Sequence, residues 1–181
     1  MKKLLTIAGS DSSGGAGIQA DLKTFAALGT YGMSCICALT AQNTKGVSMV
    51  VNTPISLVKA QLEAIYDDVA PDAVKTGMLG TAAIVDTVSD FLRNHRSAPL
   101  VVDPVMVATS GDKLLEDDAI ALYKEKLIPL AALITPNIPE AEVLSGISIT
   151  SEQDRRKAAE ILMIFLCESF LINVCHHIMD P

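Results

Sequence analysis

The 181-residue sequence contains no tryptophan, and aromatic residues make up only 4% of it. Charged residues are also scarce at 19%, while 50% of the residues are apolar, which argues against a disordered chain. No apolar run reaches the ~18 residues that a membrane span requires. Acidic and basic residues are interspersed around a net charge of −7, and no basic stripe indicates nucleic-acid binding. This composition predicts one globular domain over residues 1–181.

Paired cysteine motifs are also missing. The four cysteines are Cys35, Cys37, Cys167 and Cys175, and without a CxxC pair neither a disulfide framework nor a zinc site is expected. We interpret Cys175-His176-His177 as an accidental grouping, because no second ligand cluster accompanies it. The first apolar run ends at Gly9, too early for a secretion signal, so we expect a cytoplasmic protein.

Apolar runs alternate with amphipathic segments along the chain. The runs predict strands at 2–8, 32–40, 73–75, 100–103 and 131–135, with an edge strand or flap at 47–52. The amphipathic segments predict helices at 17–28, 54–68, 81–95 and 115–127, and a late helix after a capping box from Thr150 to Gln153. This order predicts an α/β fold with a mainly parallel sheet and helices on both faces. Ligands bind such sheets at the carboxyl ends of the strands.

A glycine-rich turn, Ser10 to Gly17, joins the first strand to the first helix. Its glycines allow close backbone approach and the helix start offers unpaired N–H groups, so it could anchor a polar ligand. The alternative is an ordinary tight turn. It is not a phosphate-binding Walker loop, because no Gly-Lys-Ser/Thr follows. In the helix, Asp21 faces a pocket or favours the first turn electrostatically.

Several side chains follow the other predicted strands. Gln42 comes after the second strand and can both donate to and accept from a heteroaromatic ring. Met78 and Val105 can form apolar walls, and Asp103 ends the fourth strand. Each of these residues alone is better explained by core packing or loop capping. Together, at one edge of the sheet, they predict a pocket.

Asn137 and Glu140 follow the last clear strand and admit two interpretations. They have the spacing of a helix N-cap and its capping partner. They also offer oxygen atoms that suit a phosphate and magnesium region. Both interpretations can hold for the same residues.

Taken in order, these motifs resemble the hydroxymethylpyrimidine/phosphomethylpyrimidine kinases of the ribokinase-like superfamily. The resemblance covers about residues 3–162. Its first block and its Gln-Asn-Thr block are specific, while the other motifs are shared more widely across ribokinase-like enzymes, so pyridoxal kinases are the nearest competitor. The resembling segments are Thr6-Ile7-Ala8-Gly9-Ser10-Asp11, Ser13-Gly14-Gly15-Ala16-Gly17-Ile18-Gln19-Ala20-Asp21, Ala41-Gln42-Asn43-Thr44, Lys75-Thr76-Gly77-Met78-Leu79, Val102-Asp103-Pro104-Val105-Met106, Ser110-Gly111 and Thr135-Pro136-Asn137-Ile138-Pro139-Glu140-Ala141.

The resemblance implies a three-layer ribokinase-like fold and a kinase of thiamine biosynthesis. It implies ATP-dependent phosphorylation of 4-amino-5-hydroxymethyl-2-methylpyrimidine and then of its monophosphate, with Mg²⁺, and it suggests a homodimer. By motif matching, the phosphate and metal region would contain Asp103, Asn137 and Glu140, with Asp103 the candidate catalytic residue. The residues that would line the pyrimidine site are Gly9, Ala16, Asp21, Gln42, Met78 and Val105.

The end of the chain departs from this pattern. Such kinases continue to a strand ending in Lys-Gly-Gly-His and then to a catalytic glycine-rich turn, whereas the last glycine here is Gly146. We therefore expect the fold to be missing its C-terminal part, with residues 163–181 outside the family pattern, and hypothesise a frameshift or premature stop. One alternative function is an inactive truncated chain that binds the pyrimidine; another is a pyridoxal/pyridoxine kinase.

Overall fold

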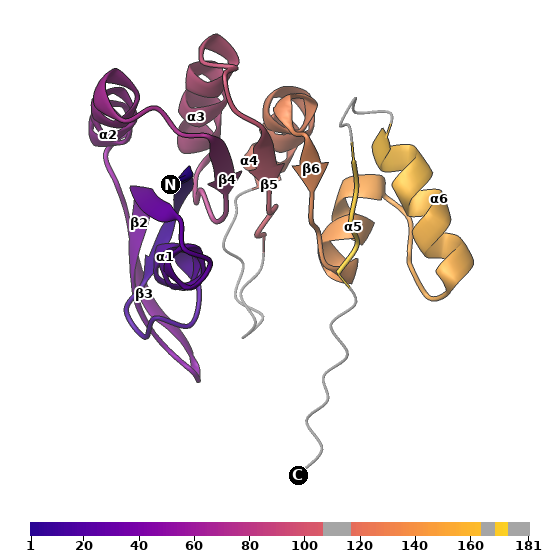
Figure 1. The fold of residues 1–181 in the computed structure, drawn as a ribbon. Helices are drawn as coiled ribbons and strands as arrows, with labels where there is room; N and C mark the ends of the chain where they lie inside the picture. The colour runs from indigo at the N-terminus through magenta and orange to yellow at the C-terminus, as the bar shows by residue number, and fades with distance from the viewer. Residues whose placement is uncertain (107–116, 164–168, 174–181) are drawn as a thin grey trace.

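A computed structural model of the chain describes residues 1–106, 117–163 and 169–173 (Figure 1). Within these ranges no helix has the length and apolar character needed to cross a membrane. The segment Cys175-His176-His177 and Cys167 lie outside the described residues. Cys35 and Cys37 lie inside them, and both are free and buried.

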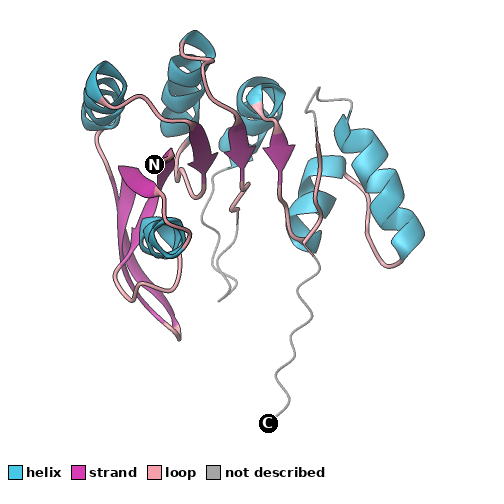
Figure 2. Ribbon diagram, in the orientation of Figure 1, coloured by secondary structure: helices cyan, strands magenta, loops and turns pink. Residues whose placement is uncertain are grey.

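The described strands form one six-stranded sheet in the order β3-β2-β1-β4-β5-β6. The pairing of β2 with β3 is antiparallel and the other pairings are parallel (Figure 2), which confirms the predicted mainly parallel sheet. The strand bounds are β1 Lys3–Asp11, β2 Tyr31–Asn43, β3 Gly46–Asn52, β4 Ala73–Thr76, β5 Leu100–Val102 and β6 Leu133–Ile134. Strand β3 lies at the edge, as its alternating β-branched residues predicted.

Strand β2 is longer than predicted. It continues to Asn43, so Gln42 lies in the strand and not after it. The extension exists because Gln42 pairs with Val47 of β3 across an irregularity in the register. Beyond β6, isolated bridges from Ile134 to Phe170 and from Asn137 to Asn173 continue the parallel pairing.

The described helices occupy the predicted segments with small shifts: α1 Gly17–Ala27, α2 Ile55–Asp68, α3 Ala82–Asn94, α4 Asp117–Leu122, α5 Ile138–Ser145 and α6 Glu152–Met163. The predicted helix at 115–127 is only partly α-helical. After α4 it becomes a π-helical turn, Tyr123–Leu127, and then a 3₁₀ turn, Ile128–Leu130. Pro129, which cannot donate a backbone hydrogen bond, lies within this last turn, and the helical run ends at Leu130.

The start of α6 also differs from the prediction by one residue. Ser151, not Thr150, accepts a hydrogen bond from the Asp154 backbone N–H at 3.2 Å. The Asp154 carboxylate in turn accepts from the backbone N–H of Ser151 at 3.0 Å. The shorter acid Asp154 therefore takes the capping role that the sequence pattern assigned to Gln153.

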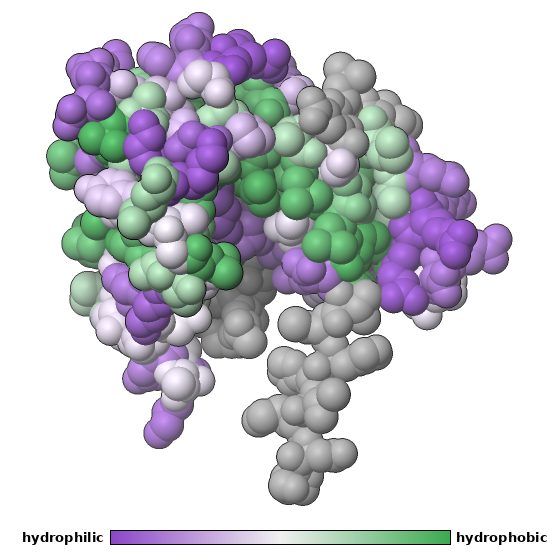
Figure 3. Space-filling view, viewed as in Figure 1, coloured by the Kyte–Doolittle hydropathy of each residue, from purple (hydrophilic) through white to green (hydrophobic). Residues whose placement is uncertain are grey.

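Helices lie on both faces of the sheet, as predicted. On one face, α1 packs on β1 and β2, where the missing side chain of Gly32 makes room for Leu22 and Phe25. On the other face, α2 packs on β2 and α3 packs against α2 and α4. Alternate sheet residues such as Leu5, Ile7 and Cys35 point into this second layer and are fully buried. Helices α5 and α6 pack together beyond β6 (Figure 1), and the outer side of α6 is strongly hydrophilic (Figure 3).

Candidate active site at the carboxyl edge of the sheet

The glycine-rich turn after β1 is organised by one buried carboxylate. Asp11 is 3% exposed and accepts hydrogen bonds from the backbone N–H groups of Ser13, Gly15 and Ala16 at 2.8–3.0 Å. Burial raises the pKa of Asp11, but these bonds and that of the Ser13 hydroxyl outweigh burial and hold the pKa below its usual value. The N–H groups of Gly15 and Ala16 are therefore already satisfied within the protein, as in a tight turn.

The turn also requires a glycine where it meets the helix. Gly17 has a φ of +56°, and a Cβ there would lie 2.3 Å from the Gly9 carbonyl oxygen. No L side chain fits such a position without moving the backbone. This close approach places Ala16, which is exposed at the N-cap of α1, beside the carboxyl end of β1.

Gln42, near the end of β2, lies against the same glycine-rich turn. The Thr40 hydroxyl donates to the Ser10 carbonyl at 2.9 Å and is 3.1 Å from Gln42 Oε1. The Gln42 backbone N–H donates to Ser12 Oγ at 2.9 Å, and that hydroxyl donates to the Gln42 carbonyl at 2.8 Å. These bonds fix Gln42 against the glycine-rich turn with its side-chain amide nitrogen still free to donate.

Gly9 and Met78 bring the ends of β1 and β4 together. The Gly9 N–H donates to the Met78 carbonyl at 3.0 Å. A Cβ on Gly9 would lie 2.5 Å from Met78 Cε, so the methionine side chain occupies the space that glycine leaves open. Met78 is 9% exposed and forms an apolar wall beside Gly9, while its contact with a ligand stays a prediction.

A lysine between two carboxylates lies next to this wall. Lys75 Nζ is 2.9 Å from Asp21 Oδ1 and 3.3 Å from Asp103 Oδ2. The Thr6 hydroxyl also donates to Asp21, at 2.6 Å. Asp21 lies in the second turn of α1, so the interpretation that it favours the first turn electrostatically is wrong. Its carboxylate instead joins the helix to β1 and β4.

The three charges set each other's protonation. Burial alone would lower the pKa of Lys75, but Asp103 and Asp21 raise it above its ordinary value. Burial raises the pKa of Asp103. The charge of Lys75 lowers this pKa, and the charge of Asp21 raises it further. Lys75 therefore keeps its proton and supplies the cation that allows two carboxylates to lie near each other.

Asn137 and Glu140 form the capping box that the sequence predicted. The Glu140 N–H donates to Asn137 Oδ1 and the Asn137 N–H donates to Glu140 Oε2, both at 2.9 Å. Glu140 is 4% exposed, and its other oxygen accepts from the Met106 N–H at 3.4 Å. Burial, aided by the charge of Asp103, raises the pKa of Glu140 to about 7 against the opposing effect of these bonds.

These contacts bring most of the predicted residues together at the carboxyl edge of the sheet, meaning the ends of β1, β2, β4, β5 and β6. Val105 belongs to the same edge through its N–H, which donates to the Asp103 carbonyl at 2.9 Å. Sequence reasoning left Lys75 and Thr6 without roles. A lysine within a buried strand was the available signal, because lysine is rarely buried without a partner.

Comparisons with known proteins find similar kinases. The chain is 48% identical to the hydroxymethylpyrimidine/phosphomethylpyrimidine kinase of Bacillus subtilis (strain 168) over 178 residues, which are 98% of this chain and 66% of that protein. The crystal structure of phosphomethylpyrimidine kinase from Clostridium difficile 630 matches with a TM-score of 0.91 and 47% identity, over 99% of this chain and 78% of that one.

A pyridoxal kinase from Staphylococcus aureus, solved in complex with AMP-PCP and pyridoxal, matches with a TM-score of 0.80 and 40% identity. That match covers 91% of this chain and 59% of the other. The chain spans about two thirds or less of the length of the curated relatives it matches. The family model for phosphomethylpyrimidine kinase matches residues 11–180. The chain therefore belongs to the phosphomethylpyrimidine kinase family.

Proposed function

We propose that the chain serves the ATP-dependent phosphorylation of 4-amino-5-hydroxymethyl-2-methylpyrimidine, and of its monophosphate, in thiamine biosynthesis. The observation that carries the proposal is the series of contacts along the carboxyl edge. It begins with a free amide group on Gln42, passes the apolar wall of Met78, and ends at the acidic groups Asp103 and Glu140. A heteroaromatic ring would match the amide and the apolar wall at one end. A transferred phosphoryl group with its metal ion would match the acidic groups at the other.

The chemistry of Asp103 and Glu140 fits a divalent cation held through water and phosphate oxygens. The charge of Asp103 raises the pKa of Glu140, so the two carboxyl groups repel each other across the ends of β5 and β6. In the described residues no group of three acidic, histidine or cysteine side chains could hold a metal by protein ligands alone. Mg²⁺ commonly binds through one or two carboxylates with water and substrate phosphates, which this pair can provide.

The residues of the chain would act mainly by positioning and by charge. Gln42 and Met78 would orient the ring, with Gly9, Ala16, Asp21 and Val105 completing the pyrimidine side. Asp103 and Glu140, with Asn137 fixing Glu140, would hold Mg²⁺, which supplies charge neutralisation at the ATP phosphates. Asp103 is 31% exposed at its side chain and is the acidic group best placed to meet a substrate hydroxyl. The proposed reaction takes place in the cytoplasm.

We further propose a homodimer that forms through the β2–β3 flap. On one face of this hairpin Leu39 opposes Val51, and Ala41 opposes Met49. Leu39 is 54% exposed, Val51 is 57% exposed and Met49 is 63% exposed. Sedimentation equilibrium would test this: the Met49→Asp variant should shift the protein towards monomer, whereas an unchanged mass would contradict it.

Two other functions compete with the proposal. Phosphorylation of pyridoxal is supported by the 40% identity to the pyridoxal kinase described above. Pyrimidine binding without turnover is supported by the absence of glycine after Gly146 in these 181 residues. Loss of phosphoryl-stabilising donors costs roughly 3 kcal/mol each in the transition state.

One experiment separates these functions. The purified 181-residue chain is assayed for phosphate transfer from ATP to the hydroxymethylpyrimidine and to pyridoxal, and its binding of each compound is measured by calorimetry. Turnover of the pyrimidine supports the proposal, turnover of pyridoxal alone supports the competitor, and binding without turnover supports the third function. Absence of both heat and turnover would overturn all three.

The Gln42→Leu variant tests the site itself. Removal of the amide should weaken pyrimidine binding about tenfold, since a hydrogen bond in a pocket typically contributes ~1 kcal/mol or more. Ser48→Ala is the matched control, because Ser48 belongs to the same hairpin and its hydroxyl donates to the Ala41 carbonyl on the exposed flap. Equal affinities for the two variants would remove Gln42 from the site.

A further inference from the structure

A second cavity lies at the opposite end of the sheet from the candidate active site. It has a volume of about 360 Å³, at the small end of the range of ligand pockets. Leu100 is the first residue of β5 and Ala132 directly precedes β6, so the cavity opens at the amino ends of these strands. Asp103 and Asn137 follow the carboxyl ends of the same strands. The two sites are therefore separated by the length of the sheet.

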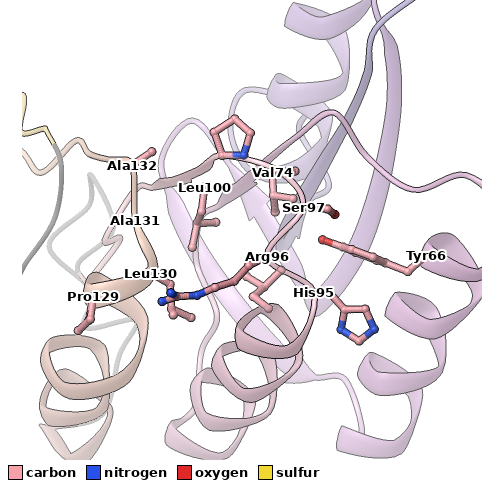
Figure 4. A pocket seen from close by; sticks show the side chains of 13 residues that line it. Tyr66, Val74, His95, Arg96, Ser97, Leu100, Pro129, Leu130, Ala131 and Ala132 are labelled. Atoms are coloured by element: carbon pink, nitrogen blue, oxygen red, sulfur yellow. The ribbon is translucent and has the colours of Figure 1, made fainter.

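Most of the side chains that line the cavity are apolar, and polar atoms are interspersed among them. Side chains such as Val74, Leu100 and Leu130 line it, as Figure 4 shows. Its charged lining residue is Arg96, and no aspartate or glutamate belongs to the lining. Within the part of the chain that the structure describes, Arg96 has no hydrogen bond or ion pair. Arg96 is exposed in the loop after α3, so its guanidinium is accessible to an anion from solvent.

A polar group without a partner lies at another part of the cavity. Tyr66 Oη is buried and makes no hydrogen bond among the described residues. Its ring is held in place by edge contacts with Phe91 and His95, each at a centroid distance of 5.1 Å. Figure 4 shows the Tyr66 hydroxyl directed from α2 towards the loop at Ser97, while Arg96 extends the other way, towards Leu130. Burial raises the pKa of Tyr66 to about 12, so the hydroxyl is a neutral donor.

The loop that carries Arg96 is held in a defined conformation. His95 stacks on Phe91 with ring centroids 4.1 Å apart, and its Nδ1 is 2.8 Å from the Phe91 carbonyl oxygen. The Ser97 N–H donates to the His95 carbonyl at 2.8 Å, and the Val74 N–H donates to the Pro99 carbonyl at 3.0 Å. A ligand would thus meet a preformed wall, which lowers the ordering cost of binding.

We propose that this cavity binds a small organic anion with a flat apolar body, its charged head on Arg96 and its body against the aliphatic walls. A guanidinium binds carboxylate or phosphate groups with directional hydrogen bonds, and the aliphatic walls favour an apolar body over a bare ion. The Tyr66 hydroxyl would donate to an acceptor on the ligand after a small shift of the ring. The site is distinct from the proposed kinase site and does not depend on it.

Benzoate is a suitable probe, with benzamide as its neutral counterpart and inorganic phosphate as a bare anion. Titrations of the full 181-residue chain are followed by amide chemical shifts in NMR spectra. A compound of this size in a fitting pocket is expected to bind with a Kd of about a millimolar. Benzoate should perturb the signals of the cavity residues saturably, and benzamide and phosphate should each bind about tenfold more weakly.

Variants connect the binding to the cavity. Arg96→Gln should weaken benzoate binding about tenfold, whereas Arg93→Gln should leave it unchanged, because Arg93 is paired with Asp90 and does not line the cavity. Tyr66→Phe should raise the Tm by about 2–4 °C, because it removes an unsatisfied buried hydroxyl, and should weaken the binding of 4-hydroxybenzoate, whose phenol oxygen can accept from Tyr66, whereas benzoate has no such acceptor. A purely structural role for Tyr66 would change the Tm alone.

Three results would overturn the proposal. The first is no saturable benzoate signal at the cavity. The second is equal binding by the Arg96→Gln and Arg93→Gln variants. The third is phosphate binding as strong as that of benzoate, which would refute a role for the apolar walls. Because none of these measurements involves ATP or the pyrimidine, failure here is separate from failure of the proposed kinase function.

Discussion

Replacement of Lys75 by methionine should destabilise the protein more than its exposure suggests. Lys75, Asp21 and Asp103 are 26%, 14% and 31% exposed at their side chains, so all three are largely removed from water. Methionine keeps most of the packing volume but removes the cation, which leaves two carboxylates without their shared partner. Breaking a fully buried pair costs 3–5 kcal/mol and an exposed pair at most ~1, so we expect a loss of about 2–3 kcal/mol.

Urea unfolding followed by circular dichroism measures this loss at neutral pH. Lys59→Met is the matched control, since Lys59 pairs with Glu63 at 3.8 Å with side chains that are 62% and 52% exposed. The control should lose less than about 0.5 kcal/mol. The double variant Lys75→Met/Asp21→Asn should lose less than the sum of its two single variants, because Asp21 then carries no unpaired charge.

Equal free energies of unfolding for Lys75→Met and Lys59→Met would contradict a stabilising role for Lys75. Strictly additive losses in the double variant would contradict it too, because the lysine and the aspartate would then be energetically independent. Either result would mean that water, and not Lys75, compensates the carboxylates at this edge of the sheet.

Two further predictions concern the glycine-rich turn and the apolar wall. Asp11→Asn should cost about 1–3 kcal/mol at pH 7, because an amide cannot accept all the N–H bonds that the carboxylate accepts. The folded-state pKa of Asp11 lies below its unfolded value, so its stabilising contribution is present above that value and is lost as pH falls through the folded pKa. The difference between wild type and variant in urea unfolding should therefore shrink as the pH is lowered below the usual carboxyl range, and a difference that stays constant with pH would contradict this. Gly9→Ala should change stability by only about 1 kcal/mol, because the new Cβ displaces the flexible end of the Met78 side chain. The same displacement should weaken pyrimidine binding in calorimetry. Unchanged affinity would show that Met78 does not contact the ligand.

The features that sequence reasoning predicted correctly rest on short-range patterns. The capping box of Asn137 and Glu140 spans three residues, so its spacing is visible in the sequence and its geometry follows from the helix start. The edge strand β3 was visible as an alternation of β-branched residues. The parallel sheet followed from the regular alternation of strands and helices. The error in β2 arose because its last residues are ordered by pairing with β3, which a propensity pattern does not include.

Only the tertiary structure decided which charges meet. Asp21 and Lys75 are 54 residues apart, and they meet because β1 pairs with β4 in a register that places Thr6 opposite Lys75 while α1 covers that face. The unpaired Arg96 and the buried hydroxyl of Tyr66 likewise share a cavity only once α2, β5 and the 3₁₀ turn are packed. Sequence by itself determined the elements, the family motifs and the local caps, since these depend on neighbouring residues. The charge cluster and the second cavity depend on strand register and packing, which join residues that are distant along the chain.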